Sequence, residues 1–120
     1  MFDRVGGAWF FERLVRTFYA DVAGDELLAP LYPEAPDFSG ATHRLTMFLV
    51  QYWGGPTDYS DARGHPRLRM RHVNFAIGAA ERDAWFGHMA NAVKAAHLDP
   101  ADELEMLGYF ANAATHMINI

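Results

Sequence analysis

The distribution of proline divides this chain into regular ends and an interrupted middle. Five of the six prolines lie between residues 30 and 66, none precedes them, and Pro100 alone follows. Proline lacks a backbone N–H and fixes φ, so it interrupts helices and central strands. We therefore expect long regular elements toward both ends of the chain, with turns and loops concentrated in the middle.

Apolar residues recur at spacings of three and four along four long segments, which is typical of helices with one buried face. The segments predicted to be helices are 8–22, 39–53, 81–98 and 101–118. Their predicted buried faces are Phe11, Val15, Phe18, Tyr19 and Val22; Ala41, Leu45, Phe48, Leu49 and Tyr52; Trp85, Met89, Ala92, Val93 and Ala96; and Leu104, Leu107, Ala111, Ala114 and Ile118. With no repeat and no linker between them, the pattern predicts one all-α domain over residues 1–120.

Local signals refine the ends of these helices. A brief helix is expected over residues 25–28, and Ser39 is expected to cap the helix that follows it. Asp99 and Pro100 suit the cap and the first position of the last helix. Residues 67–75 begin with Arg alternating with Leu and Met, a pattern that fits a strand and a short helix equally well.

Composition excludes several classes of function. The chain carries 10 basic and 15 acidic residues, a formal charge of −5, which argues against a nucleic-acid partner. Cysteine is absent, so disulfides, thiolate catalysis and Cys-ligated zinc are excluded. No stretch approaches about 18 consecutive apolar residues, and Asp3 stands where a signal peptide carries positive charge. We expect a cytoplasmic protein without a membrane partner.

One of the six histidines differs from the rest. His72 closes the run 63–72, which holds four of the ten basic residues, whereas His88, His97 and His116 miss the predicted buried faces and are expected at the surface. The run has three interpretations: a solvated basic face, a nucleic-acid site, or a site in which His binds a metal and Arg neutralises an anionic cofactor. Haem needs both parts, an axial imidazole and cations for its propionates.

Three aromatic residues with polar tips bear on that third interpretation. Tyr19 and Trp85 lie on predicted buried faces, and Tyr32 lies in the proline-rich segment. A buried Tyr hydroxyl or Trp N–H needs a hydrogen-bond partner. Taken singly, each fits an ordinary aromatic core. Together with one Arg-flanked His in a helical chain, they fit a polar pocket around an iron-bound ligand.

Six motifs in order make the sequence resemble a known family. They are Val5-Gly6-Gly7, Phe18-Tyr19, Leu31-Tyr32-Pro33, Met47-Phe48-Leu49 through Gln51-Tyr52-Trp53-Gly54-Gly55-Pro56, Arg63-Gly64-His65-Pro66-Arg67-Leu68-Arg69-Met70-Arg71-His72, and Glu81-Arg82-Asp83-Ala84-Trp85. With His72 thirteen residues before Trp85, the chain resembles the truncated haemoglobins over essentially its full length, and most closely their second group.

The resemblance implies a two-over-two helical sandwich around one haem b. It assigns His72 as the iron ligand. On the ligand-binding, or distal, side it places Tyr19, Tyr32, Trp85, the gate residue Ala41, and Leu45 one turn deeper. Phe48 is a further haem contact. The resemblance also makes Arg71 and Arg44 the propionate partners, with His65, Arg67 and Arg69 as lesser candidates. Many relatives have a polar residue at the positions of Ala41 and Leu45, so distal polarity here must come from the three aromatic residues.

The resemblance also implies a function. The open sixth iron position would bind O₂, CO, NO or peroxide, and Trp and Tyr donors would slow O₂ release. Slow release points to peroxidase-like chemistry or NO dioxygenation, with a reductase as electron donor, rather than to oxygen transport. Two alternatives stay open: a gas or redox sensor acting through a partner, and a cofactor-free helical interaction domain. Self-association into a homodimer is left open by the sequence.

Overall fold

The computed structural model describes residues 2–32, 34–35, 37–54 and 77–118. These residues contain six helical segments. They are α1 (Phe2–Val5), α2 (Ala8–Ala23), the 3₁₀ helix η1 (Ala29–Leu31), α3 (Ser39–Tyr52), α6 (Ala79–Ala95) and α7 (Pro100–His116). No strand occurs among these residues, which confirms the all-α prediction. Within the same ranges, no helix is long and apolar enough to cross a bilayer.

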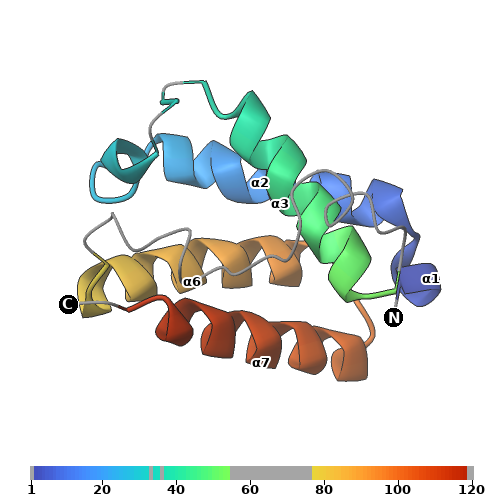
Figure 1. Ribbon diagram of the computed structural model, residues 1–120. Coiled ribbons are helices and arrows are strands. Elements are labelled where there is room, and N and C mark those ends of the chain that lie inside the picture. Colours follow the sequence, from blue (N-terminus) through green and yellow to red (C-terminus); the bar gives the residue numbers. More distant parts are fainter. Residues whose placement is uncertain (1, 33, 36, 55–76, 119–120) are drawn as a thin grey trace.

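The long helices form two layers (Figure 1). α2 and α3 cross each other in one layer, and α6 and α7 run antiparallel in the other. α2 also packs against α6, which joins the layers. This two-over-two arrangement is the fold that the sequence motifs predicted.

α2 is the central helix of the core. Its buried residues are Phe11, Leu14, Val15, Phe18, Tyr19 and Val22. The other three long helices add Ala41, Leu49, Val50, Met89, Ala92, Val93, Met106 and Phe110. The predicted face of α2 is therefore confirmed. Each large apolar side chain buried here contributes about 1.5–3 kcal/mol relative to an exposed position.

The predicted buried faces of the other helices are partly wrong. Ala114 is buried as predicted, but Leu104 is 74% exposed, because α7 turns Met106 and Phe110 inward instead. α7 carries two apolar stripes, and the buried one includes Phe110, which packs against Trp85 of α6. Tyr52 is 47% exposed, and Ala96 is exposed just beyond the end of α6.

Two local predictions also need correction. Instead of a helix over residues 25–28, the chain makes a turn in which Asp25 Oδ1 accepts hydrogen bonds from the backbone N–H groups of Leu27 and Leu28, and η1 follows. Ser39 is the first residue of α3 rather than its cap, and its N–H donates to Asp37 Oδ1. The pattern of residues 67–75 lies outside the described residues.

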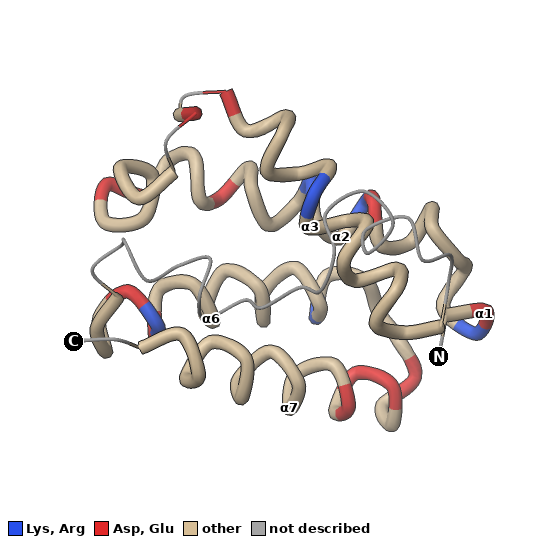
Figure 2. Tube along the Cα trace, in the orientation of Figure 1, with Lys and Arg blue, Asp and Glu red and all other residues tan. Residues whose placement is uncertain are grey.

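The amino-terminal segment is held at both of its ends. The Phe2 N–H donates to the Trp53 carbonyl at 3.2 Å, and the Arg4 guanidinium donates to Asp102 Oδ1 at 2.9 Å. Asp102 is buried in the first turn of α7, where acidic residues gather (Figure 2). The helix dipole favours negative charge at that end. Arg4 therefore neutralises a carboxylate that the fold has removed from water.

The Arg4–Asp102 pair predicts a pH dependence of stability. The hydrogen bond from Arg4 holds the pKa of Asp102 below its ordinary value of 3.8. A carboxyl whose pKa is lowered by folding stabilises the fold above its unfolded pKa, and loses that contribution as pH falls through the folded value. We expect Asp102→Asn to lower the urea midpoint at pH 6 and to have a much smaller effect near pH 2. Asp3→Asn is the control, and an effect of Asp102→Asn that is the same at both pH values would contradict the expectation.

Candidate functional site

Three polar aromatic side chains meet between the two layers. Tyr19 comes from α2, Tyr32 follows η1, and Trp85 comes from α6. The rings of Tyr19 and Tyr32 meet edge to face with centroids 5.5 Å apart, and Trp85 meets Phe18 in the same way at 5.1 Å. Phe38 stacks on Tyr19 at 5.7 Å. The structure thus brings together residues that the sequence places up to 66 positions apart.

The three polar tips form one hydrogen-bonded set centred on Tyr32. Its hydroxyl shares a hydrogen bond with the Tyr19 hydroxyl, and its oxygen accepts another from the Trp85 indole N–H. A phenol oxygen offers two acceptor sites and one proton. The hydrogen bond between the two hydroxyls uses one of their two protons, so the pair keeps one phenolic proton to donate.

Burial keeps the two phenols protonated. Burial raises the pKa of Tyr19, and the neighbouring Tyr32 and the hydrogen bond shared with it raise that pKa further. Burial also raises the pKa of Tyr32, although its hydrogen bonds with Tyr19 and Trp85 oppose the rise. Both groups are therefore neutral O–H donors at physiological pH.

The α3 residues predicted to face the same site carry no polar side chain. Ala41 is buried, whereas Leu45 and Phe48 are half-buried against the core. None of these three can donate a hydrogen bond from its side chain. Among the predicted distal residues, the hydrogen-bonding capacity thus belongs to Tyr19, Tyr32 and Trp85.

Arg44 lies at the edge of this site. Its guanidinium donates to the Glu34 carboxylate at 2.6 Å, and its positive charge partly offsets the rise in the pKa of Tyr19. Gly40 leaves the space that the pair occupies, since a Cβ there would come within 3.1 Å of both charged groups. Arg44 is thus a cation near the aromatic set, engaged by an exposed carboxylate.

The predicted iron ligand and several predicted anion partners fall in another part of the chain. His72, Arg71, His65, Arg67 and Arg69 lie outside the described residues. Within the described ranges, no group of three His, Asp or Glu side chains could hold a metal ion.

One histidine prediction was wrong. His97 and His116 are exposed, as expected, but His88 is half-buried and its Nε2 lies 2.7 Å from Asp25 Oδ2. Helical periodicity carries no signal for this contact, because its partner lies 63 residues earlier in a turn.

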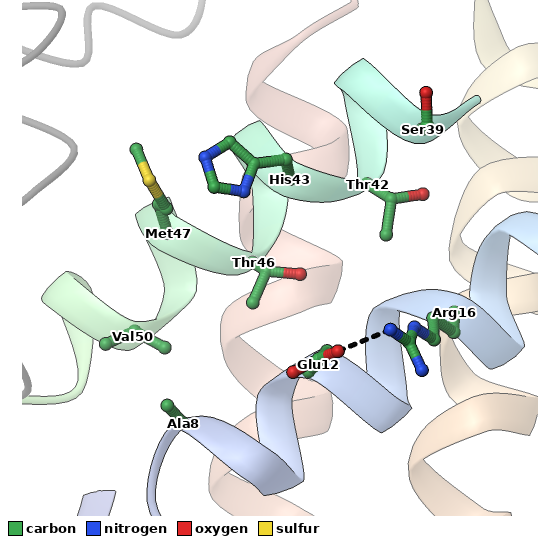
Figure 3. Close-up of a pocket in the computed structure, with 9 residues that line it drawn as sticks. All are labelled: Ala8, Glu12, Arg16, Ser39, Thr42, His43, Thr46, Met47 and Val50. Atoms are coloured by element: carbon green, nitrogen blue, oxygen red, sulfur yellow. Dashed lines mark hydrogen bonds and ion pairs between the residues drawn. The ribbon is translucent and has the colours of Figure 1, made fainter. Parts of the chain in front are cut away.

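A separate cavity of about 590 Å³ lies between α2 and α3 (Figure 3). Its lining residues are Ala8, Glu12, Arg16, Ser39, Thr42, His43, Thr46, Met47 and Val50. None of them is among the predicted site residues. Arg16 is held by Glu12 one turn before it, so its charge is already compensated.

Comparison with known proteins identifies the family. The family model described as bacterial-like globin matches residues 1–119. The chain belongs to the bacterial-like globin family. The group 2 truncated haemoglobin YjbI of Bacillus subtilis is 36% identical over 113 residues, which cover 94% of this chain and 84% of that protein. This places the chain with the second group of truncated haemoglobins, as its motifs predicted.

Solved structures support the same assignment. The thermostable haemoglobin of Thermobifida fusca is 50% identical with a TM-score of 0.96, covering 99% of this chain and 96% of that one. The oxygen-avid truncated haemoglobin of Bacillus subtilis is 36% identical with a TM-score of 0.87, covering 94% of each chain. The truncated-globin fold of this chain is thus confirmed.

Proposed function

We propose that this truncated haemoglobin binds one haem b through His72, holds O₂ with slow release, and uses it to convert NO to nitrate. The observation that carries the proposal is the Tyr32-centred set, which presents a phenolic proton in a largely apolar interior. The oxygen avidity stated for the Bacillus subtilis relative agrees with it.

The described residues fit a haem. A flat apolar macrocycle needs apolar walls, and Leu45 and Phe48 on α3 provide them while half-buried against the core. A propionate needs a cation at the edge, and Arg44 is one. In the proposal Arg44 and Arg71 hold the propionates, with His65 as a lesser partner, and Arg44 exchanges its Glu34 contact for a propionate.

The haem would supply an iron that binds diatomic ligands and changes oxidation state. The chain's own residues orient donors toward whatever binds there. Tyr32 is held by its hydrogen bonds to Trp85 and Tyr19, so the phenolic proton that remains free has a restricted direction. Such preorganised donors stabilise negative charge without reorganising.

The free phenolic donor bears on whether the protein keeps O₂ for chemistry or delivers it. At about 1–2 kcal/mol, one such hydrogen bond slows O₂ release by roughly 5- to 30-fold. A protein that releases O₂ so slowly delivers it poorly, whereas NO, a small apolar molecule, can enter and react. The reaction combines NO, O₂ and one electron to give nitrate, so a cytoplasmic reductase must supply one electron per turnover.

The decisive experiment mixes the haem-loaded, oxygenated protein with NO in a stopped-flow instrument. We expect nitrate in a 1:1 ratio to protein, formed much faster than O₂ dissociates. O₂ dissociation that outpaces NO consumption, with nitrate well below that ratio, would instead favour oxygen transport.

A further inference from the structure

We propose that Asp25 and His88 are positioning residues that hold the Tyr32 hydroxyl in register with the Trp85 indole N–H. The proposal rests on the proposed function, because it assigns a role at the same site. The backbone that carries Tyr32 is less firmly supported than the helices that carry Tyr19 and Trp85.

Tyr19 and Trp85 stand on long helices, but Tyr32 does not. It follows the three-residue η1, and its own N–H donates to the Ala29 carbonyl at 3.1 Å. Ring contacts with Tyr19 and Phe38 orient its side chain. Apart from the Trp85 hydrogen bond itself, none of these contacts connects the segment from residue 25 to residue 32 to α6.

The Asp25–His88 contact connects the segment that leads to Tyr32 with α6. His88 lies three residues after Trp85, on a neighbouring part of the α6 surface. Its Nε2 is 2.7 Å from Asp25 Oδ2, and the two side chains are only 24% and 20% exposed. Figure 1 shows the connection between α2 and α3 at the same end of the molecule as the first turns of α6.

Asp25 also organises the turn that leads to η1. While Oδ2 faces His88, Oδ1 accepts from the N–H groups of Leu27 at 2.8 Å and Leu28 at 3.4 Å. The hydrogen bond from His88, followed by that from the Leu27 N–H, holds the pKa of Asp25 below its ordinary value. One ionised carboxylate therefore joins the start of the Tyr32 segment to the helix of Trp85.

Three variants distinguish a role in positioning Tyr32 from a general contribution to the stability of the fold. His88→Leu removes the contact, whereas His88→Gln keeps an N–H that can reach Asp25. Asp25→Ser keeps an oxygen for the turn but is too short to reach His88. His116→Leu, at an exposed helix position, is the matched control.

The readout is hydrogen exchange of the Trp85 indole N–H, measured by NMR on the full purified chain and compared with the global unfolding free energy of each variant. The Trp85 resonance is assigned among those of the three tryptophans by its loss in Trp85→Phe. We expect exchange to accelerate about tenfold beyond any loss of global stability in His88→Leu and Asp25→Ser. Wild-type exchange is expected in His88→Gln and His116→Leu.

Exchange that rises only as far as global stability falls would overturn the proposal, because the pair would then be merely structural. Unchanged exchange in both disruptive variants would also overturn it. If His88→Leu does not fold, Asp25→Ser decides alone. The exchange measurement does not depend on O₂ or NO chemistry, so it tests the positioning role even if the proposed function fails.

Discussion

Replacing His72 with glycine is expected to abolish stable haem retention, or to make it dependent on added imidazole. The assignment rests on the place of His72 at the end of the Arg-rich run and on its match to the family motif. Because the iron would lose its only protein ligand on that side, the Soret band should be lost on gel filtration and return when imidazole fills the space.

His43→Gly and His65→Gly are the controls for this prediction. His43 lines the separate cavity between α2 and α3. His65 lies seven residues before His72 in the same run. If either control loses haem while His72→Gly retains it, the ligand has been assigned to the wrong histidine.

Trp85→Phe is expected to raise the O₂ dissociation rate by about tenfold or more, because a phenolic donor that Trp85 no longer holds in place would give up a hydrogen bond to O₂ of about 1.4 kcal/mol. The substitution keeps most of the aromatic bulk and removes the N–H. In the structure that N–H donates to Tyr32, so its loss also frees the Tyr32 hydroxyl to turn away. Stopped-flow displacement of O₂ by CO measures the rate, and CO dissociation, which depends less on donors, should change less.

A double-mutant cycle tests the hydrogen-bonded set itself. Tyr32→Phe combined with Trp85→Phe should be strongly non-additive, because both substitutions remove the same hydrogen bond. Trp53→Phe is the matched control, since Trp53 packs against Phe11 and Tyr109. Additive effects, or an unchanged rate in Trp85→Phe, would reduce Trp85 to a packing role.

The sequence predicted those parts of the fold that depend on local pattern. α2 has a single apolar stripe, so its buried face could be read directly from spacing. α7 has two, and only tertiary packing selects Met106 and Phe110 over Leu104. α1 has four residues, too few to show a period, and its backbone and side-chain contacts with Trp53 and Asp102 are long-range.

That three polar aromatic residues belong together could be predicted, but their hydrogen bonds could not. The family motifs named Tyr19, Tyr32 and Trp85, and the fold brings them together. Which of the three share hydrogen bonds depends on three-dimensional geometry, so the central place of Tyr32 could not be foreseen. The Asp25–His88 contact escaped prediction for the same reason.

Titration of haem into the purified apoprotein, followed by visible absorption, tests whether this chain is a haem protein that binds diatomic gases. We expect a Soret band that saturates at one haem per chain, and a ferrous form whose spectrum shifts on addition of O₂ and of CO. The absence of a Soret band after reconstitution would contradict the proposed function. A ferrous spectrum that neither gas changes would contradict it as well.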